Sequence, residues 1–337
     1  MAHMNHLSRR GKFLLLSTIP LYFMVCGFLL QPVNEIWPGI VTLIREPDFL
    51  ITDYFVVGGV GAAFLNAGML TLLSIALIYF LGMEMDGHTI TSACLMFGFS
   101  LFGKNLLNIW AVMVGIWLYA KYHKMPVSKY IYIGLYGTSL SPIITQIMQI
   151  GQMPLIFRVF LALGAGMVIG FVLPPLATHV HFSHKGYSLY NVGFAAGIIA
   201  TVIVSLLKSF GITVESRLIW YTGNTMTFFA ILCILFAGMA VGALYVGGRQ
   251  AVEEYRAILK CSGIGGTDYL RDNGGPATVL NMAVNGFLST LMVVIAGGDL
   301  NGPTIGGIFT IVGFSSTGKH IRNIFPIMMG VYLAGLT

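Results

Sequence analysis

The residues whose types and spacing most suggest chemistry form the segment "GFSSTGKHI", from Gly313 to Ile321. Its G-x-x-x-x-G-K spacing matches the start of a phosphate-binding loop, in which a strand leads into a glycine-rich turn and a Ser or Thr after the Lys holds Mg²⁺. Here His320 follows Lys319, and the flanking stretches "GGIFTIV" and "NIFPIMMGVYLAGL" resemble bilayer-spanning sequence. The segment therefore lacks a ligand that a nucleotide site requires, and the rest of the chain has to explain it.

The composition predicts a membrane protein. Of the 337 residues, 56% are hydrophobic and only 9% are charged, and the mean hydropathy is +0.84. A soluble domain carries about 25% charged residues. Apolar stretches long enough to cross a bilayer recur along the chain, and the 42 glycines suit close helix packing in lipid. We therefore expect an all-α integral membrane protein with about 9–11 transmembrane or re-entrant helices.

An internal repeat accounts for the motif. The triplet "TDY" at Thr52–Tyr54 returns at Thr267–Tyr269, 215 positions later, and the two copies align without a gap as far as Leu118 and Leu333. The loop therefore occurs twice, and its first copy, "GFSLFGKN", also lacks the Ser or Thr. A nucleotide site would not need two copies between apolar helices, so we interpret the motif as a repeat feature. The identical pairs include Asn66/Asn281, Gly87/Gly302, Thr89/Thr304, Gly103/Gly318, Lys104/Lys319 and Asn108/Asn323.

The repeat divides the chain. Residues 1–10 combine a cloning remnant, "MAHM", with a cytoplasmic N-terminus, and residues 11–210 form the first repeat. A connector at 211–225 leads to the second repeat at 226–337, which lacks the C-terminal part that follows the first loop. We therefore expect the native chain to continue beyond Thr337.

Charge predicts the topology. Lysines and arginines gather in the N-terminus, in loop 121–129 and in loop 249–271, whereas loop 32–53 is acidic. The positive-inside rule then places the N-terminus in the cytoplasm. If 88–103 crosses the membrane, each repeat holds seven spans and the second is inverted; if it is re-entrant, the repeats are parallel. The candidate spans are 12–31, 60–82, 88–103, 105–120, 130–150, 154–177, 189–209, 226–246, 276–298, 303–317 and 320–336.

Paired polar residues are the candidates for substrate binding or pore lining. Ionisable groups in or near spans are costly and mark functional sites, and helix breaks at Gly-Gly expose backbone groups to a cavity. The alternative roles are structural: a lysine that snorkels from a tight turn and an asparagine that bonds a neighbouring helix. The candidates are Asn66, Asn281, Ser100, Lys104, Ser315, Lys319, Gly59, Gly274, Asn108 and Asn323, with Glu84 and Asp299 as charge partners of the lysines.

Cysteines and histidines do not predict a metal site. The cysteines are scattered without a C-x-x-C motif, and the histidine spacing matches no zinc motif. No Ser-His-Asp set or paired catalytic carboxylates are present, so we expect neither a cofactor nor an enzyme. The net charge of +6 lies on no basic aromatic patch, which argues against nucleic acid as a partner. The residues concerned are Cys26, Cys94, Cys233, Cys261, His179, His181 and His184.

The chain resembles a prokaryotic membrane-protein family known only as a domain of unknown function. The resemblance is carried by "GFSxxGK", "GLYGTSLSPI" and "YNVGFAAGIIATVI" and extends over essentially the whole length. The stretch "GLYGTSL" is also similar to a Gly-Leu-Tyr-Gly segment of urea channels, which have inverted repeats, although their Leu-Pro…Pro-Phe filter signature is missing here. The first resemblance implies a prokaryotic membrane origin, and the second is an analogy only.

These observations predict a multi-pass protein of the prokaryotic cytoplasmic (inner) membrane. We expect it to move a small polar or anionic solute through a site at the interface of two inverted repeats. The alternatives are a passive channel for a small neutral solute such as urea, and an intramembrane enzyme or non-transporting scaffold. The expected partners are the lipid bilayer and the solute. Proteins of this kind are often homo-oligomers, and the sequence fixes no number of subunits.

Overall fold

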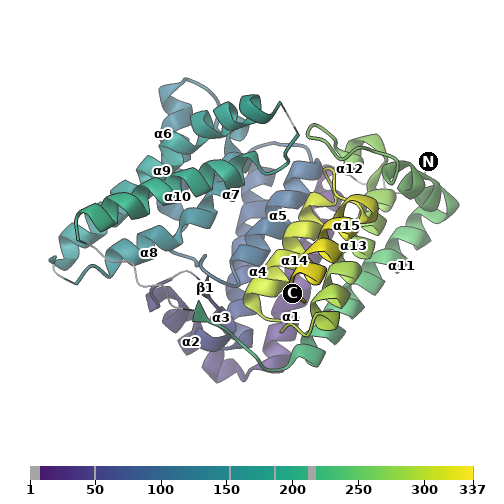
Figure 1. The fold of residues 1–337 in the computed structure, drawn as a ribbon, viewed down its shortest axis with the longest axis horizontal. Coiled ribbons are helices and arrows are strands. Elements are labelled where there is room, and N and C mark those ends of the chain that lie inside the picture. The colour runs from purple at the N-terminus through teal and green to yellow at the C-terminus, as the bar shows by residue number, and fades with distance from the viewer. Residues whose placement is uncertain (1–7, 49–50, 152, 186, 212–217, 337) are drawn as a thin grey trace.

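The computed structural model describes residues 8–48, 51–151, 153–185, 187–211 and 218–336, and it is almost entirely α-helical (Figure 1). Six of the described helices are long and apolar enough to cross a membrane. The chain is therefore a polytopic α-helical membrane protein, as its composition predicts. The six helices are α1 (Arg9–Leu30), α4 (Val60–Phe80), α9 (Leu155–His184), α10 (Asn191–Ser209), α11 (Thr225–Ile258) and α13 (Gly275–Ile295).

Shorter elements connect these helices. Two strands of two residues each, β1 (Ile51–Thr52) and β2 (Leu218–Ile219), pair in parallel. They connect the segment before α3 with the segment before α11. The short helices are α2 (Val33–Arg45), α3 (Tyr54–Val57), α5 (Gly87–Phe99), α6 (Trp110–Tyr122), η1 (Val127–Lys129), α7 (Ile131–Gly137), η2 (Thr138–Leu140), α8 (Pro142–Met148), α12 (Tyr269–Asp272), α14 (Gly302–Phe314) and α15 (Ile321–Ala334).

The predicted spans at 88–103 and 303–317 are wrong in length. Helices α5 and α14 have 13 residues each. At 1.5 Å per residue each is about 20 Å long, short of a roughly 30 Å bilayer core. Capping boxes begin both helices, and glycines with positive φ, Gly103 (107°) and Gly318 (146°), turn the chain soon after they end. These turns could not be recognised in the apolar sequence, because the turn residues are themselves small or buried.

Other boundaries also differ from the predictions. The acidic loop 32–53 contains α2, whose buried residues Ile36, Ile40 and Leu43 recur at helical spacing on one face. The span predicted at 105–120 begins only at Trp110, and the span at 130–150 is broken into three pieces. The span at 226–246 continues to residue 258 through a kink at Gly248 (φ 52°).

Helices α5 and α14 lie side by side at the centre of the bundle and run antiparallel. A side chain added at Gly98 would meet the backbone of Gly306, and one added at Gly313 would meet Thr91. Residue numbers therefore rise along one helix as they fall along the other. Glycine at the Gly98–Gly306 crossing lets the two backbones touch, which is how small residues pack helices in lipid.

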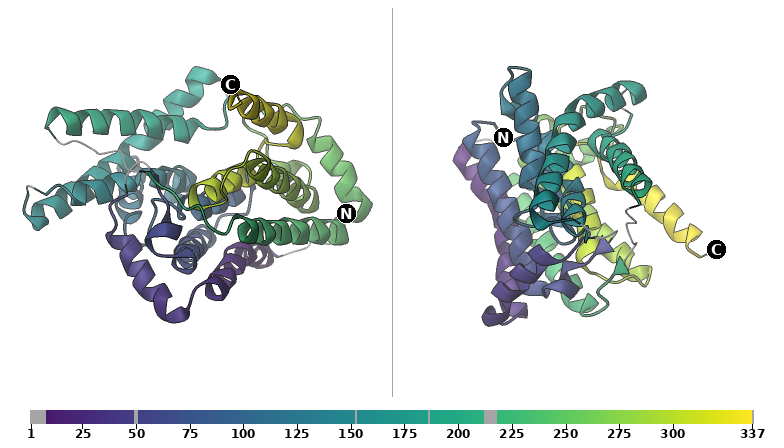
Figure 2. Two further views of the ribbon diagram at one scale, coloured as in Figure 1. Left: turned by 60° about the horizontal axis from the view of Figure 1, so that its bottom comes forward. Right: turned by 90° about the vertical axis from the view of Figure 1, so that its left-hand side faces the viewer.

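The remaining helices surround this pair. Helix α4 packs on α5 and is covered by α1, while α13 packs on α14 and is covered by α11. Helices α6 to α10 form a separate hydrophobic core and extend to one side of the bundle (Figures 1 and 2). Each part of the chain, residues 8–211 (the first half) and residues 218–336 (the second half), therefore contributes to the bundle a short central helix, a long helix packed on it and a helix that covers the long one.

Candidate functional site

Asn66 and Asn281, predicted to line a pore or bind substrate, tie loops to helices. The Asn66 Nδ2 donates to the carbonyl oxygens of Ser100 and Lys104, both at 2.8 Å. The Asn281 Nδ2 donates to the two carbonyls 215 positions later, both at 2.7 Å. Each amide thus holds the loop after a short central helix against the long helix beside it. Both side chains are fully buried, and their Oδ1 atoms have no partner within the described chain.

Six of the other predicted residues have local roles in turns and helix ends. The Asn108 Nδ2 donates to the carbonyl of Gly103, and the Asn323 Nδ2 donates to the carbonyl of Gly318, both at 2.9 Å. The hydroxyls of Ser100 and Ser315 donate to the carbonyls one helical turn earlier, at 2.6 and 2.7 Å. Gly59 and Gly274 precede α4 and α13 with nearly identical dihedral angles, φ 86° and ψ 160° against φ 83° and ψ 163°.

The two predicted lysines lie in different surroundings. Lys104, which the seven-span topology places at a surface, is instead 1% exposed. Among the described residues, its ammonium group has polar or aromatic partners in the Leu135 carbonyl, at 3.4 Å, and the Phe99 ring, at 5.1 Å. Lys319 is less buried and lies over the Tyr190 ring at 5.3 Å. Sequence equivalence therefore does not give equivalent electrostatics at this pair.

The predicted charge partners do not reach the lysines. The Glu84 carboxylate lies 3.9 Å from the Arg9 guanidinium, and the Asp299 carboxylate accepts a hydrogen bond of 3.1 Å from the Trp220 indole. Neither lysine forms an ion pair with a carboxylate in the described ranges. The predicted neutralisation fails because both acids point toward residues that the sequence pattern did not connect to them.

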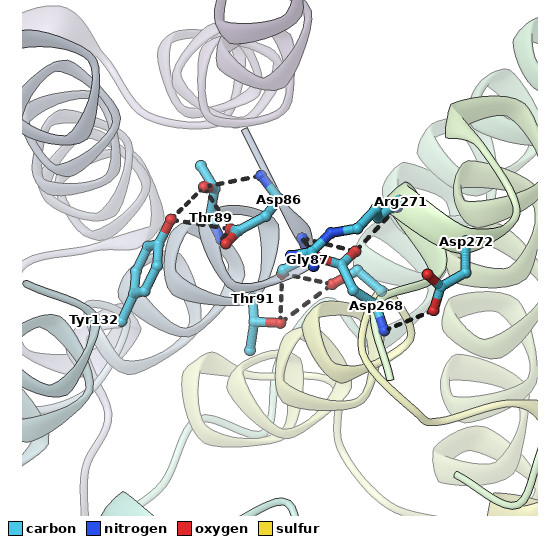
Figure 3. Close-up of polar contacts among 9 residues, drawn as sticks. Asp86, Gly87, Thr89, Thr91, Tyr132, Asp268, Arg271 and Asp272 are labelled. Carbon is cyan, nitrogen blue, oxygen red and sulfur yellow. Dashed lines mark hydrogen bonds and ion pairs between the residues drawn. The ribbon is translucent and has the colours of Figure 1, made fainter. Parts of the chain in front are cut away.

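Two aspartates that the site prediction left out make crossed contacts between the halves. The Asp268 carboxylate accepts from the Gly87 backbone N–H at 3.1 Å and so binds the start of α5 (Figure 3). The Asp53 carboxylate correspondingly accepts from the Gly302 N–H at the start of α14. Each aspartate thus stabilises the positive end of the central helix that belongs to the other half.

The environments of these two aspartates differ. Asp53 is fully buried and also accepts from the backbone N–H groups of Phe55 (3.0 Å) and Tyr221 (3.2 Å). Burial raises the pKa of Asp53 to about 6, although these hydrogen bonds oppose the rise. Asp268 is 6% exposed and lies 3.6 Å from the Arg271 guanidinium, which is itself largely exposed.

A large cavity opens beside Asp268 and Arg271. Its volume is about 1220 Å³. It lies between the N-terminal part of α1 and the middle part of α11, just before the kink at Gly248, and its remaining walls come mainly from the start of α5, α12 and the start of α13. It is thus enclosed by elements of both halves of the molecule.

The cavity has apolar walls and a charged mouth. Its inner surface is formed mainly by aliphatic side chains, methionines and small residues. Both signs of charge lie at the mouth, which carries three cations and two acids. These mouth residues are Lys12, Lys129, Arg271, Glu84 and Asp86. Asp86 begins α5, and its carboxylate accepts hydrogen bonds of 2.9 Å from the hydroxyls of Thr89 and Tyr132 (Figure 3).

The sequence prediction missed this cavity. Of the predicted residues, Glu84 alone is among those that line it, within the described part of the chain. The missed residues include Gly238, Leu270 and Val279, which carry no polar group and therefore looked like packing residues. The available signal was the repeat itself, because the positions 215 residues earlier hold Phe23, Phe55 and Phe64.

The fold and cavity define a polytopic membrane protein with a large internal site between two halves. A family model matches residues 33–209 and 248–337, and the chain belongs to that family, described as "Protein of unknown function (DUF1576)". The two matched segments begin 215 positions apart, at Val33, where α2 starts, and at Gly248, where α11 kinks. No curated protein and no solved structure matches the chain. The urea-channel analogy therefore stays a prediction.

Proposed function

We propose that this protein transports an amphipathic, anionic solute across the membrane and that the solute binds in the cavity between two inverted repeats. The observation that carries the proposal is a cavity of about 1220 Å³ whose walls come from both halves. Ligand pockets usually measure about 300–1,000 Å³, so this one suits a lipid-sized molecule. Sites between repeats are typical of secondary transporters.

The contacts of the central helices support the inversion. Because α5 and α14 pack side by side and run antiparallel, their contact is the one expected if a two-fold axis perpendicular to them relates the halves. The placement of α1 and α11 agrees, since the cavity is lined by the beginning of α1 and by the part of α11 just before its kink at Gly248. The sequence argument for inversion depended on counting residues 88–103 as a membrane span. Because α5 has only 13 residues, that count no longer supports inversion. The antiparallel contact now supports inversion independently of that count.

The lining indicates the chemistry of the solute. The apolar walls suit a hydrocarbon body better than the small polar solute that the sequence favoured. At the mouth, Arg271 already faces Asp268 and Glu84 faces Arg9. Lys12 and Lys129 have no carboxylate partner among the described residues, which leaves positive charge for an anionic head group.

The rival functions have less support. A passive channel for urea would need a polar path, whereas the lining of this cavity is mainly apolar. An intramembrane enzyme would need a catalytic set beside the cavity. Instead, the buried polar groups that occur in pairs bind backbone atoms. We accordingly propose transport rather than catalysis.

The charge pattern supports an orientation. Lys12 and Arg271 lie at the cavity mouth, so the cavity opens on the same side as the start of α1. By the positive-inside rule this side is cytoplasmic, in the inner membrane of a prokaryote. We therefore propose that the structure represents the conformation open to the cytoplasm.

The test fills the cavity with a side chain. Gly238 lies on the cavity wall, and a β-carbon added there meets no atom within 4 Å. Gly238→Phe is therefore chosen to reduce the free volume of the cavity. Gly197→Phe is the matched control, since Gly197 lies on an exposed face of α10 and its side-chain direction is also open.

Binding of dodecyl phosphate to the protein in nanodiscs, and its uptake into proteoliposomes, are measured with both variants. Dodecyltrimethylammonium and urea serve as the cationic and small neutral probes. We expect Gly238→Phe to weaken dodecyl phosphate binding roughly 10-fold or more and to reduce uptake, with Gly197→Phe unchanged. Equal binding by wild type and Gly238→Phe would reject the cavity as the site. Urea flux without dodecyl phosphate binding would favour the channel instead.

A further inference from the structure

Four phenylalanines fill the end of the α1–α11 interface opposite the cavity. Phe23 comes from α1, Phe55 from α3, Phe64 from α4 and Phe228 from α11. Ring centroids lie 5.1 Å apart for Phe23 and Phe64, 5.3 Å for Phe55 and Phe64, and 5.0 Å for the stacked pair Phe55 and Phe228. All four are at most 2% exposed. We call them the aromatic cluster.

Three members of the aromatic cluster are the repeat equivalents of cavity-lining residues. Adding 215 to Phe23, Phe55 and Phe64 gives Gly238, Leu270 and Val279. All three of these smaller residues line the cavity. The cluster and the cavity therefore occupy equivalent places at opposite ends of the molecule, one filled and one open.

Side-chain volume accounts for much of the difference. The backbones that carry these residues match closely, because Gly59 and Gly274 have the same conformation and Asn66 and Asn281 make the same two bonds. The fourth ring, Phe228, extends into the cluster from α11. Its equivalent, Phe13, instead packs on Tyr79 at 5.3 Å and does not line the cavity.

We propose that the aromatic cluster is the closed gate of a second chamber, through which the solute passes to the opposite face of the membrane. This inference rests on the proposed transport function and on inversion of the two halves. In an inverted-repeat transporter the two halves exchange conformations, so that a cavity open on one face corresponds to a closed space on the other. The rings of Phe23, Phe55 and Phe64 seal that space.

A purely structural role for the cluster makes a different prediction. Packed rings stabilise any core, so a loss of stability on truncation does not distinguish a gate from a core. Access of water-soluble reagents does distinguish them. A core relaxes or collapses when rings are removed, whereas a gate opens a path to water from one particular face.

The reporter is a cysteine at Ala67. This residue is fully buried on α4, one turn after Phe64, and its equivalent, Met282, lines the cavity. The background replaces the four native cysteines, Cys26, Cys94, Cys233 and Cys261, by serine or alanine. Ala67→Cys is then combined with Phe55→Leu and Phe64→Val, which install the residues found at the cavity end.

A membrane-impermeant charged thiol reagent is applied to each face of oriented vesicles. We expect Ala67→Cys alone to react slowly, and the gate variant to react roughly 10-fold faster, from the face opposite the start of α1 only. The matched control is Phe13→Val, which removes a buried ring outside the cluster and is expected to leave the rate unchanged. Phe64→Leu provides a milder variant should the double variant not fold.

Each outcome bears on the proposal. Unchanged reactivity in folded gate variants overturns the gate, as does equal acceleration by Phe13→Val. Fast labelling of Ala67→Cys in the protein that keeps all four rings also overturns the gate. This measurement does not depend on whether a gate variant folds. Dodecyl phosphate binding is measured on the same samples. Opening of the path without such binding supports the gate while rejecting the proposed solute, so the two proposals fail separately.

Discussion

The two ends of the α1–α11 interface are built from equivalent helices yet differ in content. At one end, Gly238, Leu270 and Val279 surround a cavity of about 1220 Å³. At the other, phenylalanines at the equivalent positions close the space. A repeated backbone with the same turns and the same asparagine bonds therefore does not determine function by itself. The volumes of a few apolar side chains decide which end is open.

The aspartates at the two ends also differ, in their burial and in the hydrogen bonds that they accept. Asp53, at the closed end, is fully buried and accepts three backbone hydrogen bonds, including one from the start of α14. Asp268, at the open end, binds the start of α5 but lies close to the exposed guanidinium of Arg271. We infer that the contact at the closed end contributes more to stability, and the following experiments test this comparison.

The largest expected effect is that of Asp53→Ala. Its removal leaves three buried N–H groups without an acceptor, which costs about 3–5 kcal/mol of unfolding free energy. Asp268→Ala frees two backbone N–H groups, those of Gly87 and Arg271, rather than three, and is expected to cost about 1–2 kcal/mol. Thermal unfolding of both variants in the same detergent measures the difference. Equal losses, or a larger loss for Asp268→Ala, would contradict the contrast between the two ends.

The pH dependence of the unfolding free energy should reveal the titration of Asp53. Because burial raises its pKa to about 6, the folded state holds the proton more tightly than the unfolded state. This contribution is fully present below about pH 4 and is lost as the pH rises to about 6, so stability falls by an amount on the order of 2 kcal/mol in this window. Asp53→Asn removes the titration, so its unfolding free energy should lack this fall, and the difference between variant and wild type should change by about the same amount between about pH 4 and pH 6. A parallel pair of stability curves would rule the assignment out.

The crossing of the central helices gives a smaller effect. A methyl group at Gly98 would lie 2.9 Å from the Gly306 carbonyl oxygen, so Gly98→Ala forces the helices apart and should cost about 1–3 kcal/mol. Gly307→Ala is the control, because an added methyl there meets nothing within 4 Å. Chemical or thermal unfolding compares the two. If Gly98→Ala proves as stable as Gly307→Ala, the close contact on which the antiparallel arrangement rests is absent.

The smallest expected effect concerns the paired lysines. Lys104→Met replaces a buried, unpaired ammonium by an apolar group of similar size and should raise stability by about 1 kcal/mol. Lys319→Met changes a less buried group and should leave stability nearly unchanged. A marked loss of stability in Lys104→Met would mean that an anion accompanies this lysine in the membrane. That result would revive the lysine site predicted from the sequence.

The sequence predicted the class of protein more reliably than the site. Apolar runs identify α4 and α13 because a spanning helix needs a continuous apolar stretch. They overestimate α5, since a turn through Ser100 and Gly103 within a buried region is as apolar as the helix before it. The amphipathic helix α2 was predicted as part of an acidic loop, because the prediction used the charges of residues 32–53 and not the helical spacing of Ile36, Ile40 and Leu43.

The site was missed for a different physical reason. Polar residues attract functional interpretation, yet Asn66 and Asn281 are buried because backbone carbonyls need donors. The cavity is defined by what is small or absent, such as the missing side chain of Gly238. Nothing in a single copy of the repeat shows this. Comparison of Gly238 with Phe23 does, once the structure shows that the two positions face equivalent spaces.

The measurement that tests the account most directly is two-sided labelling of Met282→Cys in vesicles of known orientation. Met282 lines the cavity, and only 2% of its surface is exposed. The account predicts reaction with a charged thiol reagent from the face on which α1 begins, little reaction from the other face, and protection by dodecyl phosphate. Equal labelling from both faces, or from the opposite face alone, would contradict a one-sided cavity between inverted repeats.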